Sequence, residues 1–99
     1  MSTYLLTTAA DADIEEIWQY LARQSGPGAA DRLQDQLHAA MKRLAQSPGM
    51  GHFRADLADE PLRFWAVHSI LIVYRPETKP LQIIRVLHGA RDIAFLLSG

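Results

Sequence analysis

Arginine and histidine side chains gather at the end of the run from Leu81 to Asp92. The run begins with branched and apolar residues, which favour a buried β-strand, and it stops at Gly89. Arg85 interrupts the apolar residues, and His88 and Arg91 follow where the strand ends. An imidazole can transfer a proton, and guanidinium groups can bind anions or neutralise charge that develops in a transition state. We therefore expect functional residues at this end of the strand.

Most common catalytic motifs are missing from the chain. No serine lies in a nucleophile elbow, and the sequence has neither a His-Glu-x-x-His motif nor a glycine-rich phosphate loop. The four histidines lack the spacing of metal ligands, so we expect no metal and no cofactor. One catalytic alternative stays open: metal-free cleavage of a phosphodiester by Arg63, Arg85 and His88. A lone histidine at a strand end is, however, more often a structural residue.

Three strands must position these side chains. Leu62–Val67, Ile70–Arg75 and Leu81–His88 are β-prone runs of ordinary strand length. His68 and Ser69 form a two-residue connection between the first two, and residues 76–80 form a longer connection to the third. The spacing predicts an antiparallel meander.

An N-terminal strand and a helical hairpin precede the meander. Residues 4–7 are β-prone, and Thr7 or Thr8 can cap a helix whose first turns carry Asp11 and Asp13. Gly26 and Pro27 end this helix and start a second one, which stops at residues 47–49. Both helices carry an apolar stripe, so we expect them to pack as an antiparallel hairpin on one face of the sheet. The predicted fold class is α+β.

The remaining segments have weaker patterns. Residues 50–61 mix glycine, proline and charges without a period, which predicts a loop, and residues 90–97 predict a short closing helix or turn. We expect buried side chains at Trp18, Leu37, Leu44, Ile72, Ile84 and Val86.

The period of two along a strand predicts which side chains share a face. We expect the helix-covered face to hold Leu62, Phe64, Ile70, Ile72, Tyr74, Ile84 and Val86. The other face would then carry Arg63, Arg75, Arg85 and Trp65. Each arginine could instead pair with a local acid such as Asp56, Asp59 or Glu77. An exposed group of arginines and an aromatic ring is typical of partner-binding surfaces, so we expect partner binding by Arg63, Trp65, Arg75, Arg85, His88 and Arg91.

Composition limits the classes of function. With 99 residues, 48% hydrophobic and 21% charged, the chain suits one globular domain over residues 1–99. Its net charge of −1 argues against general nucleic-acid binding, although residues 61–99 hold five basic residues against two acids. The chain has no cysteine, no signal-peptide pattern and no apolar run long enough for a membrane span. We expect a cytoplasmic location.

Several motifs in this order resemble the RelE/ParE superfamily of toxins from bacterial type II toxin-antitoxin systems. The matching pieces are Asp13 to Trp18 with Tyr20, Ala30 to Leu33, Ser47 to Gly51, Leu62 to Trp65, Ile72 to Arg75 and Ile84 to Asp92. The resemblance implies the family fold, a helical hairpin packed on an antiparallel sheet. It also implies a cognate ParD-like antitoxin, whose C-terminal segment would wrap over the toxin.

The superfamily has two main branches with different activities. RelE-like toxins cleave mRNA on the ribosome, whereas ParE-like toxins poison DNA gyrase without cleaving anything. Arg63 and Arg85 match strand positions where the ribonucleases keep arginines. The loop before them carries Asp56, Asp59 and Glu60, however, and the chain has only two lysines. The resemblance is closest to the ParE branch, with DNA gyrase as the expected target and no nucleic-acid binding outside a target complex. A RelE-like ribonuclease and an inactive toxin fold remain alternatives.

Overall fold

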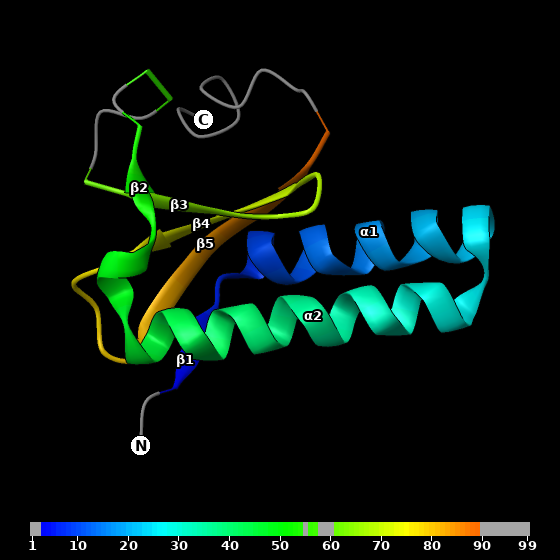
Figure 1. Cartoon of the computed structure of the whole chain (residues 1–99), viewed down its shortest axis with the longest axis horizontal. Coiled ribbons are helices and arrows are strands. Elements are labelled where there is room, and N and C mark those ends of the chain that lie inside the picture. Colours follow the sequence, from blue (N-terminus) through cyan, green and yellow to red (C-terminus); the bar gives the residue numbers. More distant parts are fainter. Residues whose placement is uncertain (1–2, 55, 58–60, 90–99) are drawn as a thin grey trace.

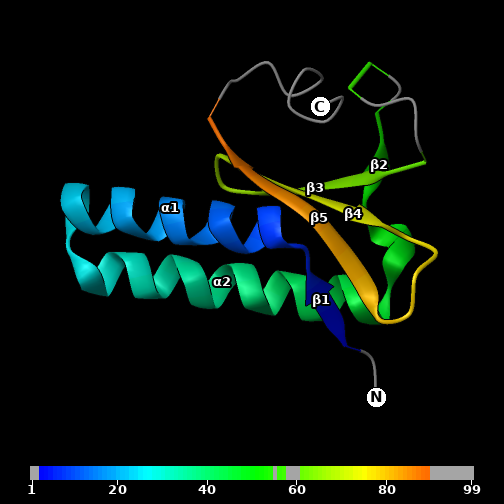
Figure 2. The same ribbon diagram turned by 180° about the vertical axis from the view of Figure 1, so that it is seen from behind.

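A helical hairpin lies along one face of a twisted sheet (Figures 1 and 2). This computed structural model describes residues 3–54, 56, 57 and 61–89. The elements in chain order are β1 (Tyr4–Leu6), α1 (Thr8–Ser25), α2 (Pro27–Gln46), the short 3-10 helix η1 (Pro48–Met50), β2 (His52–Phe53), β3 (Arg63–Val67), β4 (Ile70–Arg75) and β5 (Leu81–His88). The expected α+β class is confirmed.

Short-range signals set the ends of the helices. Thr7 caps α1, because its hydroxyl oxygen accepts a hydrogen bond from the Ala10 N–H at 3.1 Å. Gly26 separates α1 from α2 with φ of 92°, a conformation that favours glycine, and Pro27 starts α2. The two helices therefore form the predicted hairpin, whose turn projects away from the sheet in Figure 1.

The sheet has the order β1-β5-β4-β3-β2. β3, β4 and β5 form the predicted antiparallel meander, with Val67 opposite Ile70 across the two-residue turn. β1 runs parallel to β5, so the sheet is mixed rather than purely antiparallel. His52 and Phe53 form β2 at the edge beyond β3, where the sequence predicted only a loop.

Two apolar clusters hold the layers together, one on each face of the sheet. The larger cluster lies between sheet and helices and includes Ile14, Ile17, Leu37, Met41, Leu44, Ile70, Ile72, Tyr74, Ile83 and Val86. The smaller cluster, on the other face, is formed by Leu62, Phe64, Val73 and Leu87, with Leu57, Leu71 and Ile84 packed against it. Leu37, Leu44, Ile72 and Val86 are buried as expected.

The predicted faces of β3 were wrong. Trp65 lies opposite Ile72 and packs with the helix-side cluster, while Phe64 lies opposite Val73 in the other cluster. Side chains directly opposite each other share a face, and the two-residue turn fixes the pairing of Val67 with Ile70. Arg63 and Trp65 therefore belong to the helix-covered face.

A β-bulge changes the faces along β5. Tyr74 lies opposite Ile83 and Val73 lies opposite Arg85, so Ile84 is an extra residue in β5. Ile83 is fully buried under the helices, whereas Ile84 is half-buried in the smaller cluster, which reverses the prediction for both. A strict alternation cannot reveal a bulge, and for this reason the prediction was wrong.

Trp18 also departs from its predicted place in the core. Its side chain is half-exposed, and its Nε1–H donates a 2.9 Å hydrogen bond to Asp31 Oδ1 on α2. The indole thus ties the two helices together near the outside of the hairpin. The closing helix or turn predicted for residues 90–97 lies outside the described residues.

Candidate functional site

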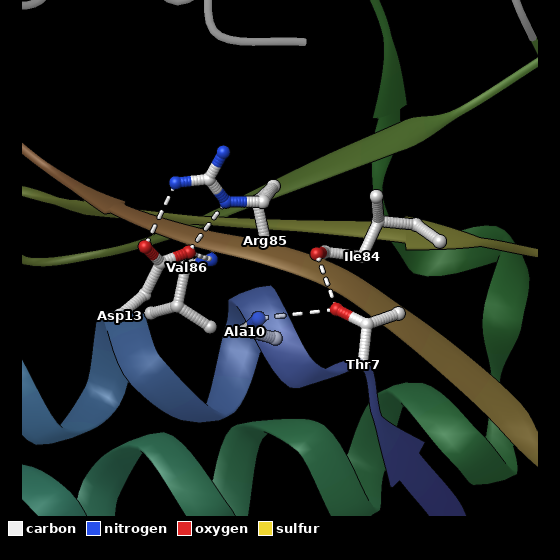
Figure 3. Close-up of polar contacts among 6 residues, drawn as sticks. All are labelled: Thr7, Ala10, Asp13, Ile84, Arg85 and Val86. Atoms are coloured by element: carbon white, nitrogen blue, oxygen red, sulfur yellow. Dashed lines mark hydrogen bonds and ion pairs between the residues drawn. The ribbon is translucent and has the colours of Figure 1, made fainter. Parts of the chain in front are cut away.

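Asp13 of α1 connects the helical hairpin to β5 (Figure 3). Its two carboxylate oxygens accept hydrogen bonds from Arg85 Nε at 2.7 Å and Arg85 Nη2 at 2.9 Å. The same carboxylate accepts a 3.0 Å hydrogen bond from the Val86 N–H. This bidentate pair raises the pKa of the Arg85 guanidinium above its ordinary value, and the charge of Glu16 adds to the shift. Arg85 is thus held in a fixed position.

Thr7 and Asp13 replace β1 as partners of the β5 edge. β1 pairs with β5 only as far as Leu6 opposite Ile83. Beyond that point the Thr7 hydroxyl donates to the Ile84 carbonyl at 2.7 Å, and Asp13 accepts from Val86, as Figure 3 shows. The bulge at Ile84 directs these backbone groups toward α1. Side chains at the start of α1 therefore take the place of a neighbouring strand along β5 beyond Ile83.

A cleft of about 460 Å³ opens next to this contact, between α1 and the end of β5. Its walls are Asp13, Glu16, Ile17 and Tyr20 of α1 and Arg85 to Gly89 of the last strand and its end. Tyr20 is 46% exposed, and its ring centroid lies 5.5 Å from that of His88. The structure thus brings Arg85 and His88 to the walls of one cleft at the end of β5.

Arg63 lies at a different site, the corner formed by η1, β2 and the start of β3. Its Nη1 donates to the Gly51 carbonyl at 2.6 Å. The buried Tyr74 hydroxyl donates to the Pro48 carbonyl at 2.6 Å and accepts from the Gly51 N–H at 2.9 Å. Burial raises the pKa of the Tyr74 phenol above its ordinary value. These contacts fix the corner through backbone groups of the turn.

Aromatic rings cover the outside of this corner. The Arg63 guanidinium lies 3.9 Å from the centroid of the Phe53 ring, a cation–π arrangement, and Phe53 is 56% exposed. His52 stacks on Trp65 with ring centroids 6.3 Å apart and planes 16° apart. Both pairs join β2 to β3. Arg63 and Trp65 thus share a surface with His52 and Phe53, for which the sequence predicts only a loop.

The six predicted partner-binding residues therefore do not form one surface. Arg63 and Trp65 lie at the corner, and Arg85 and His88 lie at the cleft. Arg75 lies opposite Gln82 on β5, one residue along β4 from the helix-facing Tyr74, so it points to the other face of the sheet. Arg91 is outside the described residues. The expected grouping of three arginines on one face is wrong for Arg63, which the register of β3 places on the helix-covered face opposite Tyr74. Arg75 and Arg85 share the other face as expected, since Arg85 lies opposite Val73.

Sequence reasoning missed Asp13, Glu16 and Tyr20 as residues of the site. Asp13 had been assigned to the dipole of the first helix, and its partner Arg85 is 72 positions away. A usable signal did exist: Asp13, Glu16 and Tyr20 follow the i, i+3, i+7 spacing of one helix face. A polar stripe next to the apolar stripe of α1 indicates a helix that lines a cleft.

Within residues 3–54, 56, 57 and 61–89, no group of three or more His, Asp or Glu side chains is placed to hold a metal ion. In the same part of the chain, neither helix combines the length and the apolar character that a membrane span requires.

Known proteins share both this sequence pattern and this fold. A family model described as ParE toxin of type II toxin-antitoxin system, parDE, matches residues 4–93. Toxin ParE1 of Caulobacter vibrioides is 35% identical over 96 residues, which cover 93% of this chain and 94% of the relative. Toxin ParE1 of Mycobacterium tuberculosis is 31% identical over 93 residues, with 93% and 94% covered.

A solved structure supports the fold independently. A chain described as the chromosomal ParDE TA system from P. aeruginosa superposes with a TM-score of 0.74 and 22% sequence identity, covering 91% of this chain and 98% of that one. The family model spans most of the chain, and both relatives exceed 30% identity over nearly their whole length. This protein therefore belongs to the ParE toxin family of type II toxin-antitoxin systems.

Proposed function

We propose that this ParE-family toxin inhibits DNA gyrase by binding to it and is neutralised by a cognate ParD-like antitoxin. Family membership supports the toxin and antitoxin roles. The rival function is cleavage of ribosome-bound mRNA by Arg63, Arg85 and His88. The two functions require different geometry, because cleavage needs an acid or base and cations around a single phosphate.

The separation of Arg63 from His88 is the observation that favours binding. His88 lies opposite Ile70, which lies opposite Val67 on β3. Arg63 is four residues further along β3, which places it about 13 Å along the strands and about 10 Å across them from His88. A general acid or base must come within about 3 Å of the proton that it transfers. Arg63 and His88 are too far apart to act on one phosphate.

The hydrogen bonds that Arg63 and Arg85 make also favour binding over cleavage. Arg85 uses Nε and Nη2 in its pair with Asp13. Arg63 bonds to the Gly51 carbonyl, on the side of β3 that faces away from β5. The two cations are thus engaged at separate places on the sheet. Arrays of this kind, in which fixed cations and exposed rings lie on rigid elements, suit contact with another protein.

Purified components can distinguish the two functions. We expect the toxin to inhibit DNA supercoiling by purified gyrase, and we expect the product of the adjacent reading frame to restore supercoiling. Added to translating ribosomes, the toxin should leave the message intact. Cleavage of message in the ribosomal A site, with gyrase unaffected, would overturn the proposal.

The variant His88→Ala sharpens this test, with His68→Ala as a matched control. His68 is an exposed histidine at the β3–β4 turn and bonds to Gln36. Loss of a general acid or base lowers a rate by about 10² to 10⁴-fold. For a toxin that binds, we expect His88→Ala to change gyrase inhibition by no more than the loss of one contact, close to the effect of His68→Ala.

A further inference from the structure

The end of β5 offers backbone groups to the cleft that no described strand uses. Strand pairing on this side ends at Ile83, and Asp13 accepts the Val86 N–H. Backbone groups of alternate residues point to the same side of a strand. The Val86 carbonyl and the His88 N–H therefore also face the cleft. Within the described ranges of the chain, neither group has a hydrogen-bond partner on that side.

The cleft has room and shape for a chain segment. Its volume of about 460 Å³ is within the usual range for binding pockets, about 300 to 1,000 Å³. Ile17 supplies an apolar wall below the strand edge, and Tyr20 supplies a partly exposed ring at the mouth. An extended segment added next to β5 would meet both the free backbone groups and these side chains.

The charge of the cleft identifies the side chain that such a segment should carry. Arg85 neutralises Asp13 through the bidentate pair. Glu16 lines the same cleft, is exposed, and has no ion-pair partner among the described residues. Tyr20 lies one helical turn further along α1 on the same face. A carboxylate without a direct ion-pair partner, beside an exposed aromatic ring, attracts a cation through charge and through the face of the ring.

We infer that the cleft binds an extended segment of the antitoxin, which pairs with the β5 edge at Val86 to His88 and places a lysine or arginine side chain between Glu16 and Tyr20. The antitoxin is the occupant that suits this edge. A segment that folds on binding brings a free backbone, and a permanent partner protects an open strand edge from non-specific pairing. The inference rests on the proposed neutralisation by an antitoxin, and it predicts a local basic contact in that partner.

The test uses the full-length toxin and the purified product of the reading frame adjacent to its gene. Glu16→Gln removes the charge that attracts the cation, and Glu15→Gln is the matched control on a different face of α1, where Glu15 accepts a hydrogen bond from Gln19. We expect Glu16→Gln to weaken the complex about tenfold, as for the loss of a charge-assisted hydrogen bond, and Glu15→Gln to change it less than twofold. Tyr20→Leu should weaken it about two- to fivefold.

Two further measurements examine the geometry. In the complex, the amide of His88 should exchange with deuterium more slowly than in the free toxin, whereas the exposed amide of Gly28 at the start of α2 should not change. Glu16→Lys should abolish tight binding, and exchange of one lysine or arginine of the antitoxin segment for glutamate should restore it.

The possible outcomes separate the inference from the proposed function. A complex that forms but responds equally to Glu16→Gln and Glu15→Gln, or leaves the His88 amide unprotected, overturns the inference and leaves neutralisation intact. Failure of the wild-type toxin to bind the adjacent product overturns neutralisation by that protein, and the inference fails with it. All variants lie on the surface of α1, and their melting temperatures check that they fold.

Discussion

Arg63 and Arg85 lie in two regions that are built in opposite ways. At the corner of η1, β2 and β3, Arg63 and the Tyr74 hydroxyl bond to backbone groups of the turn. A Cβ atom added to Gly51 would lie 2.4 Å from the Tyr74 hydroxyl oxygen. At the cleft, Arg85 bonds to a side chain, and backbone groups beside it stay open. One region is closed and the other is accessible.

The two arginines therefore have different roles, which depend on the groups that they contact and not on their residue type. Arg63 is half-buried and satisfies carbonyl groups of a turn, so its main effect is on stability, whereas its stacked partner Phe53 is exposed. Arg85 orients Asp13, which closes part of the β5 edge and leaves the next part free. We expect changes at the corner to alter stability and changes at the cleft to alter partner binding.

The largest effect that we expect concerns the bulge in β5, which buries Ile83 under the helices and places Ile84 on the other face. Ile83→Ala should lower the free energy of unfolding by about 2 to 5 kcal/mol, because this fully buried side chain packs under the helices. Ile84→Ala, the matched control in the half-buried cluster on the other face, should cost clearly less. Urea denaturation of both variants measures the difference. Equal costs would mean that β5 has no bulge and that the cleft is built differently.

Asp13→Asn is expected to have the next largest effect. Asparagine keeps the shape but loses the charge that holds Arg85, so the free energy of unfolding should fall by about 1.5 to 3 kcal/mol. Asp11→Asn is the control, because this exposed carboxylate in the first turn of α1 should contribute at most about 1 kcal/mol. Thermal and urea denaturation at neutral pH compare the two. If Asp13→Asn lowers the free energy of unfolding no more than Asp11→Asn does, the Asp13–Arg85 pair does not stabilise the contact between α1 and β5.

Tyr74→Phe tests the closed corner. It leaves the Pro48 carbonyl and the Gly51 N–H without their buried partner, which should cost about 1 to 3 kcal/mol of unfolding free energy. The change should also alter the response to alkali. Burial holds the pKa of Tyr74 above the ordinary value of 10.0, so the folded state binds its proton more tightly than the unfolded state.

The sign of this pH dependence follows from the raised pKa. The contribution of Tyr74 is complete below pH 10 and is lost as the pH rises through the pKa of the folded state. Wild-type protein should therefore lose stability above pH 10 more steeply than Tyr74→Phe does. Urea denaturation between pH 8 and pH 11 measures both slopes. Identical slopes would show that the hydroxyl is not buried at the corner.

The smallest effect concerns the outer face of the corner. Phe53→Leu removes the ring beneath the Arg63 guanidinium and should cost about 0.5 to 1 kcal/mol. A double-mutant cycle with Arg63→Gln isolates this contact, because Phe53→Leu should cost less once the cation is absent. Additive effects of the two changes would contradict a direct cation–π contact. Neither change should affect binding of the adjacent gene product at the cleft.

Local patterns predicted most of the fold. The hairpin turn at Gly26 and Pro27 and the bounds of β4 and β5 follow from glycine and proline placement and from β-prone runs. The faces of β3 were also available from the sequence, since a two-residue turn forces Val67 and Ile70 to share a face. A prediction that applies this constraint places Trp65 on the helix-covered face.

The bulge and the site were harder to predict. Nothing in the alternation of residues 81–88 marks Ile84 as the extra residue, because its neighbours on both sides are also apolar or long enough to cover apolar surface. The pair of Asp13 and Arg85 depends on β5 lying beside α1, which follows only from the parallel pairing of β1. Two-residue β2 was too short to carry a period.

Induction of the toxin in cells distinguishes gyrase binding from mRNA cleavage. Double-strand DNA breaks and mRNA cleavage are measured side by side for the wild-type toxin and for His88→Ala. For a toxin that binds gyrase, we predict DNA breaks with intact ribosome-bound message and nearly unchanged toxicity of His88→Ala. Co-expression of the adjacent gene product should suppress the breaks. Cleaved message without DNA breaks, together with loss of toxicity in His88→Ala, would contradict the account.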